Sequence, residues 1–466
     1  MKPESSETQV EDYLYSCVPP TERKSSLTMG LLWITMVTCF PNVLAGFRWY
    51  HAGMSLNQII FGVLFSCFIV LLYAIPACYL GAKFGLTYTM LSRAIFGSWG
   101  SRLITLNVIW ISMGWYALNA IFLADGVRGL FNFAVPAAPF VAVMAVLMAV
   151  NNFFGFSGVA NFAKYLAAPV LLLWVGFAFV KSVLICPASV WTEPGSISHL
   201  DCITLVSSFV VGISCWGNEP DYWRFGKPKW TFSILPLSIS LLIGMVIFPI
   251  TGWLMARLTG VHGIAAATRL MNDYVFGGLA IVSAAVLTIN YVAVNDAGLY
   301  ATINAVENLK KFPRKLCVGA LALAAAGASV MLLGYQKNFE VVAALSSIIL
   351  PSSTVIMMTE AFLIKRFWGK SEDLSVPVAY ENLPSIRWAA VSSLTVGCVI
   401  ATINSGLLPG MAHSTFGVPA LPGWIICLLL YFFLRPIELK YSSNPLCTVA
   451  NSDESPDEKL ELAGNR

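Results

Sequence analysis

Three polar side chains in one otherwise apolar stretch could carry chemistry inside a membrane. Asn290, Asn295 and Asp296 lie in the run LTINYVAVNDAGLYATINAVEN, and no basic residue lies within a helical turn of Asp296. Polar groups inside such runs are costly and usually functional. On a helix the two amides would be about 140° apart, so they cannot share a face. Asp296 therefore needs a partner on another helix or a proton, although a purely structural hydrogen bond is the alternative.

A second group combines aromatic rings with small polar side chains. Ser112, Trp115 and Asn119 follow the three-and-four spacing of one helical face, and Trp110 and Tyr116 lie beside them in the sequence. An indole next to a hydroxyl and an amide suits a flat heteroaromatic ligand, which would stack on the ring while the polar groups bind its edge. Ordinary packing of these aromatic rings is the alternative interpretation.

Two apolar stretches contain helix-breaking residues at comparable points. Pro41-Asn42 interrupts the first stretch, and residues 212–221 (GISCWGNEPD) interrupt the sixth. A proline in mid-helix removes a backbone hydrogen bond, and in hydrocarbon the freed groups are tolerated where they line a protein-enclosed or watery cavity. These positions fit an inverted repeat whose discontinuous helices surround a site near the middle of the membrane. Two ordinary proline kinks are the alternative.

Charged residues accompany the second break. Glu219 and Asp221 come shortly before Arg224, at the position expected for the cytoplasmic end of a helix. A gate ion pair and a plain solvated pair are equally good interpretations of this spacing.

Motifs of the common enzyme classes are absent from the sequence. It contains no His-Glu-x-x-His, its four histidines are scattered, and Gly369-Lys370-Ser371 lacks the upstream glycine of a phosphate-binding loop, because Ile364 stands there. The sequence therefore predicts no enzyme, no cofactor and no metal centre.

The composition places the chain in a lipid bilayer. Of its 466 residues 57% are hydrophobic and only 11% are charged, whereas soluble proteins carry about 25% charged residues. The mean hydropathy is +0.74. A net charge of +4 on so apolar a chain gives no reason to expect a nucleic-acid partner. The eleven cysteines include no Cys-x-x-Cys pair, and most lie in apolar runs, which favours buried or lipid-facing thiols over disulfides.

The apolar stretches predict an all-α membrane protein with twelve transmembrane helices, at about 20 residues per crossing. The predicted spans are 28–47, 56–80, 103–124, 136–156, 160–185, 203–222, 231–256, 276–306, 316–335, 341–364, 387–408 and 420–436. With these spans, 22 of the 28 Lys and Arg residues fall on the face of the two termini. Positive charge marks the cytoplasmic side, so both termini are predicted to be cytoplasmic in a multi-pass cell-membrane protein.

The same pattern divides the chain into three parts. Residues 1–27 are polar, carry no apolar signal-peptide core and are predicted to stay in the cytoplasm. Residues 28–436 are predicted to form the twelve-helix membrane domain, with a first repeat at about 28–185, a second at about 203–364 and two further helices at about 387–436. Residues 437–466 carry an acidic cluster and are predicted to be a disordered cytoplasmic tail.

Several of these segments resemble the nucleobase:cation symporter-1 family, especially its cytosine permease branch. The similar segments extend to about residue 368 and include Pro19–Lys24, Gly81–Thr87, Gly114-Trp115, Pro220–Phe225, Asn295-Asp296 with Leu299-Tyr300-Ala301, and Leu345-Ser346 ahead of Pro351. The resemblance implies a fold similar to that of sodium-coupled leucine transporters, with two five-helix inverted repeats and two more helices. It also implies uptake of purines, pyrimidines, allantoin, hydantoins or related compounds.

The resemblance also assigns candidate substrate-binding residues. Trp115 matches the tryptophan that stacks on the substrate in this family, and Ser112 stands where cytosine permeases carry glutamine. Gly212 falls near the position of a second stacking aromatic, for which Trp216, one turn later, is a possible substitute. Asn290 and Asn295 match amides near the substrate and ion sites.

The coupling ion is where this chain departs from the family pattern. The family's sodium site uses backbone carbonyls of the first break, here Thr35–Cys39, and two adjacent hydroxyls that are replaced by Ala293 and Val294. The loss of two hard oxygen ligands disfavours Na⁺. A proton carried by Asp296 or Glu219 is the rival, although Asp296 also matches an aspartate of sodium-coupled relatives.

The sequence thus predicts a monomeric secondary transporter that imports a nucleobase such as cytosine or a purine, or a related planar heterocycle, with Na⁺ or H⁺ as the coupling ion. An importer of another small nitrogenous solute, such as an amine or amino acid, is the alternative within transport. A transporter-like sensor that binds without net transport is the alternative from another class.

Overall fold

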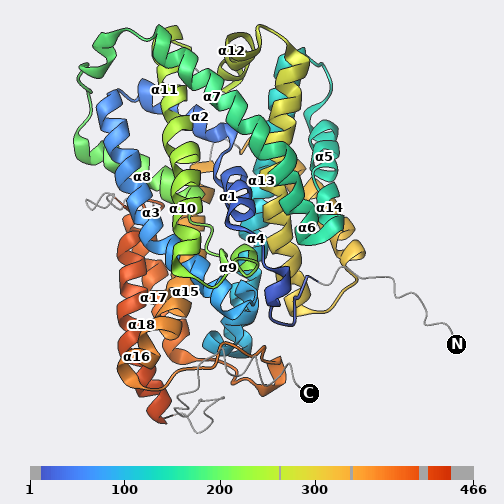
Figure 1. Ribbon diagram of the computed structural model, residues 1–466, viewed down its shortest axis with the longest axis vertical. Coiled ribbons are helices and arrows are strands. Elements are labelled where there is room, and N and C mark those ends of the chain that lie inside the picture. The colour runs from blue at the N-terminus through green and yellow to red at the C-terminus, as the bar shows by residue number, and fades with distance from the viewer. Residues whose placement is uncertain (1–11, 262–263, 336–338, 409–417, 442–466) are drawn as a thin grey trace, which may run out of the picture.

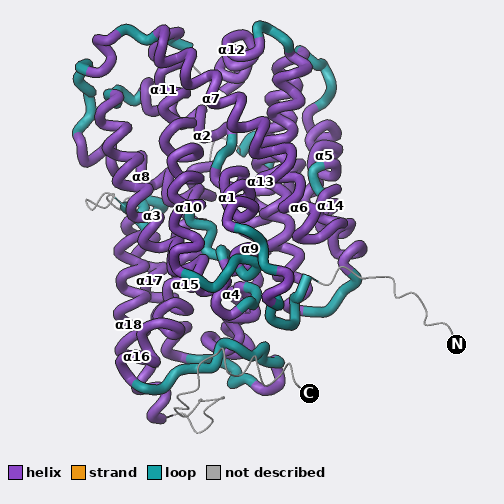
Figure 2. Tube along the Cα trace, in the orientation of Figure 1, coloured by secondary structure: helices purple, strands orange, loops and turns teal. Residues whose placement is uncertain are grey.

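The computed structural model describes residues 12–261, 264–335, 339–408 and 418–441. Helices make up nearly all of the regular structure in these ranges (Figure 2). The first half contains α1 (Ser26–Val37), α2 (Phe40–His51), α3 (Leu56–Phe84), α4 (Tyr88–Phe131), α5 (Ala137–Leu147), α6 (Gly155–Phe162), α7 (Ala168–Ile185), α8 (His199–Ser214) and α9 (Pro220–Trp223). The second half contains α10 (Trp230–Leu241), α11 (Phe248–Thr259), α12 (Ile264–Phe276), α13 (Ala280–Leu309), α14 (Arg314–Met331), α15 (Phe339–Met358), α16 (Lys365–Trp368), α17 (Trp388–Asn404) and α18 (Leu421–Tyr441).

Short 3-10 and π-helical turns join or interrupt these helices. They are η1 (Pro20–Glu22), η2 (Val150–Phe154), η3 (Ala163–Ala167), η4 (Ala188–Trp191), η5 (Leu242–Ile247), η7 (Thr359–Ile364) and η8 (Tyr380–Asn382). The π turns η3, η5 and η7 continue directly into neighbouring α-helices, so each lies within a longer helical rod.

Each of the twelve predicted spans coincides with helical structure, but fewer segments meet the length and composition of a span. Within the described ranges eight helical segments do so, or nine if the bent pair α1 and α2 counts as one span. One of the eight, Ala137–Ile185, covers the fourth and fifth predicted spans together, because α5, α6 and α7 follow one another closely. The apolar helices α8 and α17 are shorter than a span. At 1.5 Å per residue, α17 reaches only about 25 Å of a roughly 30 Å hydrocarbon core.

The helix ends also differ from the predicted ones. α4 starts at Tyr88, well before the predicted 103, and passes through a non-helical break at Gly97. α18 continues to Tyr441, so the helix takes in the first residues of the predicted tail. The remaining tail residues, 442–466, and residues 1–11 lie outside the described part of the chain.

The long helices form a bundle around α1, α4 and α13 (Figure 1). α13 packs along α4, α2 along α11, α3 along α8, and α17 along α18. Many large apolar side chains on the outer helices are exposed, among them Leu173, Leu184 and Leu323. Such a surface suits lipid rather than water. The outer surface of this fold is therefore suited to a lipid bilayer.

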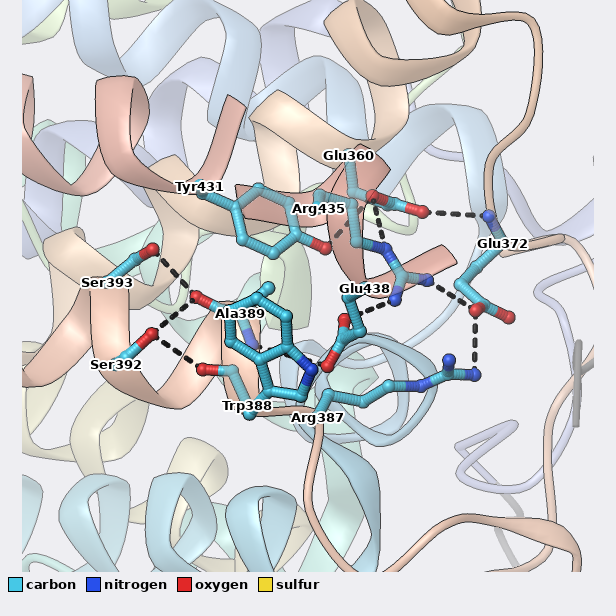
Figure 3. A network of polar contacts seen from close by, with 10 residues as sticks. All are labelled: Glu360, Glu372, Arg387, Trp388, Ala389, Ser392, Ser393, Tyr431, Arg435 and Glu438. Carbon is cyan, nitrogen blue, oxygen red and sulfur yellow. Dashed lines mark hydrogen bonds and ion pairs between the residues drawn. The ribbon is translucent and has the colours of Figure 1, made fainter. Parts of the chain in front are cut away.

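A buried cluster of charges ties the C-terminal helices to the bundle. Arg435 of α18 makes ion pairs with Glu360 of η7, Glu372 of the 369–387 segment and Glu438 of its own helix. Arg387 makes a second ion pair with Glu372, at 2.7 Å. Figure 3 shows these five side chains converging, and all five are at most 7% exposed. The charged groups compensate one another, which makes their burial tolerable.

The 369–387 segment that supplies Glu372 and Arg387 also crosses the end of α4. The carbonyl of Pro384 accepts a hydrogen bond from the amide of Ser98, 2.9 Å away, and Phe96 accepts one from the amide of Arg387, 3.1 Å away. These bonds satisfy backbone groups freed by the break at Gly97. The charge cluster therefore fixes α4, α15 and α18 relative to one another.

Candidate functional site

Two broken helices lie where the sequence predicted them. α1 ends at Val37 and α2 begins at Phe40, and their axes differ by 48°. α8 ends at Ser214 and α9 begins at Pro220. Pro41 and Pro220 each lie in the first turn of the second piece, where a missing amide costs no helical bond. Each break therefore leaves unwound backbone in the middle of the bundle.

Glu219 holds the second break. Its carboxylate accepts hydrogen bonds from the backbone amides of Trp216, at 3.0 Å, and Gly217, at 3.2 Å. Its other oxygen accepts a bond from the hydroxyl of Tyr73 on α3, at 2.9 Å. Glu219 is fully buried. Since unwound amides in a membrane need acceptors, this carboxylate stabilises the unwound backbone between α8 and α9.

α15 packs directly against this break at two glycines, one in the last turn of α8 and one in the unwound segment. A Cβ atom on Gly212 would lie 2.9 Å from the carbonyl oxygen of Ala343. Gly217 has a φ of +83°, and a Cβ there would lie 2.1 Å from the Cβ of Leu350. No larger side chain fits at either position without moving α15. Gly212 is therefore a packing contact of α15 as well as part of the cavity wall.

A cavity opens between the two breaks and α4, α13 and α15. Eight residues of the two candidate groups and the expected ion site line it, namely Ser112, Trp115, Tyr116, Asn119, Gly212, Trp216, Val294 and Asn295. The other lining residues are Met36, Cys39, Pro41, Ile111, Ile213, Cys215, Asn218, Gly298, Ser346 and Leu350. None of these eighteen side chains is ionisable to a charge near neutral pH. The cavity thus offers rings, amides, hydroxyls and apolar surface, but no formal charge.

The two tryptophans of the cavity are held differently. The indole Nε1 of Trp115 donates a hydrogen bond to the hydroxyl of Ser346 on α15, at 2.7 Å. The ring of Trp216 packs edge-to-face against Tyr222, with 6.0 Å between ring centroids. Both indoles are partly exposed although they lie inside the bundle, because the cavity borders them. Each can present aromatic surface to a ligand.

Asn295 connects α13 to α4 at the cavity wall. Its side-chain oxygen accepts a hydrogen bond from the amide of Asn119, at 2.9 Å, and its nitrogen donates to the carbonyl of Tyr116, at 3.1 Å. These contacts fix the orientation of the Asn295 amide. Asn119 and Asn295 are therefore a preorganised pair that can bind polar edges of a ligand.

Asn290 faces a different neighbour, as the helical geometry predicted. Its nitrogen donates to the carbonyl of Thr38, at 2.8 Å, and its oxygen accepts from the amide of Phe40, at 3.0 Å. Asn42 donates to the carbonyls of Val37, at 2.7 Å, and Gly244, at 2.9 Å. Side-chain amides thus satisfy the unwound backbone of the first break, and Asn290 does not line the cavity.

Asp296 is fully buried and does not line this cavity. Its carboxylate accepts hydrogen bonds from the amides of Asn151, at 2.7 Å, and Asn152, at 3.3 Å. Both asparagines lie in η2, near the end of the fourth predicted span. The consecutive amides in an apolar run were the only signal in the sequence for this partner. Ala293, beside Asp296 in sequence, is buried and does not line the cavity.

Neither interpretation of the charges after the second break was right. Asp221 and Arg224 are fully buried, so they are not a solvated pair. The guanidinium of Arg224 donates to the backbone carbonyl of Asp221 and the hydroxyl of Tyr300, rather than to a carboxylate. The carboxylate of Asp221 instead accepts a bond from the amide of Tyr88, at 2.9 Å, at the start of α4. These groups join α9 to α4 and α13 by hydrogen bonds.

Two further observations limit the site. Trp110 is 45% exposed and bonds only to Asn107 on its own helix, so it faces away from the cavity. In the described ranges, no group of three or more His, Cys, Asp and Glu residues could hold a metal ion.

Outside the membrane, hydrogen bonds from Arg257 lower the pKa of Glu193, which lies in the loop after α7.

Broken helices around an uncharged cavity define a class of membrane transporter, and solved structures share this fold. The chain matches Mhp1, a nucleobase-cation-symport-1 family transporter solved in a closed conformation with bromovinylhydantoin bound, with a TM-score of 0.71 at 17% identity, over 94% of this chain and 97% of that one. It matches a Na⁺-coupled sialic acid symporter with a TM-score of 0.64 at 10% identity, over 93% of each chain.

The family follows from the sequence match. Residues 17–418 match the family described as permeases for cytosine/purines, uracil, thiamine and allantoin. The chain belongs to this family, so it is a multi-pass membrane transporter and not an enzyme. It is also 24% identical over 424 residues to the cytosine permease of Escherichia coli strain K12, covering 86% of this chain and 91% of the permease.

Proposed function

We propose that this chain imports a neutral nucleobase, such as cytosine or a purine, or a related planar heterocycle such as allantoin or a hydantoin. Import takes place by alternating access around the cavity between the two broken helices. The observation that carries the proposal is the cavity lining, in which two indoles and an amide pair surround a space without a charged side chain. Rings stack on indoles, and amides bind the donors and acceptors on a heterocycle's edge.

The same lining disfavours the alternative solutes. An amine or amino acid carries a formal charge, and burying a charge without a partner costs far more than burying a neutral polar group. None of the lining side chains carries a formal charge that could pair with an ammonium or a carboxylate. A neutral ring avoids this cost, since its polar edge can be satisfied by Asn119, Ser112 and the unwound backbone.

For the coupling ion, we propose a proton rather than Na⁺. Ala293 and Val294 supply no hydroxyl oxygen, and the carbonyls of Val37 and Thr38 already accept hydrogen bonds from Asn42 and Asn290. Without these hydroxyls a sodium ion would lose two hard oxygen ligands, which disfavours sodium coupling. The buried carboxylates of Asp296 and Glu219 are the groups that could carry a proton across the membrane.

The architecture proposed for this function has two five-helix inverted repeats, at 28–185 and 203–364, and two further helices. The breaks support it, since one follows the start of each repeat.

We also propose a monomer with both termini in the cytoplasm. In Figure 1 the first and last described residues lie in the same half of the molecule. Cys17 is an exposed thiol on this side, and Thr192 is exposed in the loop between α7 and α8.

Thiol labelling tests this orientation. In intact cells, a membrane-impermeant maleimide should label a Thr192→Cys variant, and should label Cys17 only after permeabilisation. Both are tested in a Cys186→Ser, Cys447→Ser background, which removes the half-buried thiol near Thr192 and the thiol of the tail. The reverse pattern would overturn the orientation without affecting the substrate proposal.

Uptake into proteoliposomes tests the function itself. Radiolabelled cytosine, adenine, uracil and allantoin are offered separately, with sodium and proton gradients imposed one at a time. Accumulation of at least one of them under a proton gradient without sodium is expected. Strict dependence on sodium would refute the coupling proposal, and binding without accumulation under either gradient would favour the sensor.

A further inference from the structure

The geometry points to Ser346 of α15 as a positioning residue that fixes the stacking surface of Trp115 and links it to α15. This inference rests on the proposed function, because it assigns a role in binding the planar substrate. It concerns a residue that is neither on the helices that carry the two breaks nor among the substrate-binding residues predicted from the sequence.

Ser346 has a defined hydrogen-bonding role. Its hydroxyl accepts the indole proton of Trp115, with 2.7 Å between Nε1 and Oγ, and donates its own proton to the carbonyl of Val342, also at 2.7 Å. A hydroxyl has one proton to donate, so the bond to Val342 orients its lone pairs. Because an indole has a single N–H, Trp115 has no donor left for a substrate. What it offers to the cavity is the face of its ring.

Packing alone does not hold that ring. Trp115 is only partly buried, because one side of it borders the cavity. A side chain with free space on one side can rotate about its χ angles, and each ordered rotamer costs conformational entropy on binding. The bond to Ser346, which is itself only 4% exposed, fixes the ring before a substrate arrives. Preorganisation of this kind raises affinity.

The same bond connects the ring to the second break. α15 carries Ser346, and it also packs against Gly212 in the last turn of α8 and against Gly217 in the unwound segment. The hydroxyl of Thr354, two turns after Ser346, donates to the carbonyl of Gly217. A shift of α15 would therefore displace the stacking surface and the unwound backbone together. Ser346 makes the position of the substrate ring depend on the position of α15.

A double-mutant cycle separates this role from direct contact with the substrate, since Ser346 also lines the cavity. The Trp115→Phe variant keeps a ring but has no N–H to donate. If Ser346 acts through the indole, Ser346→Ala should weaken binding in the wild-type background and change nothing in the Trp115→Phe background. If Ser346 touches the substrate, the loss should be equal in both backgrounds.

The measurement is equilibrium binding to the purified full-length protein. Cytosine, adenine, uracil and allantoin are each titrated by scintillation proximity, and the tightest binder is used for the cycle. We expect Ser346→Ala to raise Kd roughly fivefold, which corresponds to one hydrogen bond. Ser346→Cys, nearly isosteric but a weaker acceptor, should lie between. Ser329→Ala removes a buried hydroxyl that bonds only within α14, and should leave Kd unchanged.

The outcomes are distinct. An unchanged Kd in Ser346→Ala, or the same rise in both backgrounds, would overturn the positioning role while the proposed function stands. Failure of the wild type to bind any of the four compounds would instead defeat the proposed function. Thermal unfolding of each variant shows whether a loss of binding reflects a loss of folded protein, in which case Ser346→Cys decides the question.

Discussion

Two buried polar regions of this molecule are built from opposite kinds of side chain. The cluster at α18 contains five charged residues that pair with one another (Figure 3). The cavity between the broken helices contains none. Both regions lie among the packed helices rather than on the outer surface of the bundle.

The difference follows from what each region does during a cycle of binding. A charged group that loses its partner in a buried place costs several kcal/mol, whereas an unpaired neutral group costs about 1–3 kcal/mol. A cavity that is alternately empty and filled must tolerate unpaired polar groups. Neutral groups suit it because leaving them unpaired costs less free energy than leaving a charge unpaired. The cluster at α18 can use charges, because its ion pairs join helices permanently and no charge loses its partner.

The largest effect is expected from the stacking surface. Trp115→Ala removes the ring that borders the cavity, and should reduce uptake more than about 100-fold while the protein still reaches the membrane. Initial uptake rates and membrane abundance are the measurements. Trp110→Ala is the matched control, because that indole is exposed and points away from the cavity. Wild-type affinity in Trp115→Ala would refute the stacking role.

Removing the central cation of the charge cluster should act on stability rather than on binding. Arg435→Met leaves Glu360, Glu372 and Glu438 without their common partner, and the expected loss is about 3–5 kcal/mol of unfolding free energy. A large fall in the thermal midpoint is expected, with the Kd of the remaining folded protein unchanged. Lys440→Met, on the exposed side of α18, should have no effect. A changed Kd with a wild-type midpoint would contradict the assignment.

The two asparagines of α13 should differ in kind. Asn295→Ala removes a cavity-lining amide and leaves Asn119 without its acceptor, so Kd should rise about 10- to 100-fold. Asn290→Ala frees backbone groups of the first break, at Thr38 and Phe40, and should lower stability while affinity changes less. Binding and thermal midpoints measured on the same samples test this. Equal effects on Kd would mean that Asn290 also reaches the substrate.

The smallest effect is expected from an ion pair outside the membrane. Arg257 lowers the pKa of Glu193 by hydrogen bonding, so the ionised carboxylate stabilises the fold above its ordinary pKa of 4.5. This contribution is lost as pH falls through the lowered pKa. Because the pair is about one third exposed, Glu193→Gln should lower the thermal midpoint by only about 1 °C at pH 7, and the difference should shrink as the pH is lowered below 4.5. A drop as large as that of Arg435→Met would contradict the contrast between exposed and buried charges.

How much of the fold and of the candidate site could be predicted from the sequence depends on how far apart the interacting residues are along the chain. Local patterns predicted the positions of both breaks, because Pro41 and residues 212–221 act on their own backbone. Helical spacing predicted that Asn290 and Asn295 face different neighbours. The family resemblance supplied Trp115 and Asn295 as binding candidates, and both line the cavity.

Interactions between distant segments could not be read in this way. Asn151 lies 145 positions from Asp296, and Ser346 lies 231 positions from Trp115. The pairing of Arg224 was misjudged, because a spacing of three residues suggested Asp221 while the fold brings in Tyr300. The predicted start of the third span missed the helix from Tyr88, because that part of α4 is stabilised by Asp221 and by the 369–387 segment rather than by its own apolarity.

The central claim, that the cavity accepts neutral planar rings, is tested most directly by comparing uracil with orotate, which is uracil bearing a carboxylate. Labelled uracil and orotate are each offered outside proteoliposomes, in parallel with labelled cytosine, adenine and allantoin, and their accumulation inside is measured. The account predicts accumulation of at least one neutral compound and exclusion of orotate. Accumulation of orotate, or failure to take up any of the neutral rings, would contradict it.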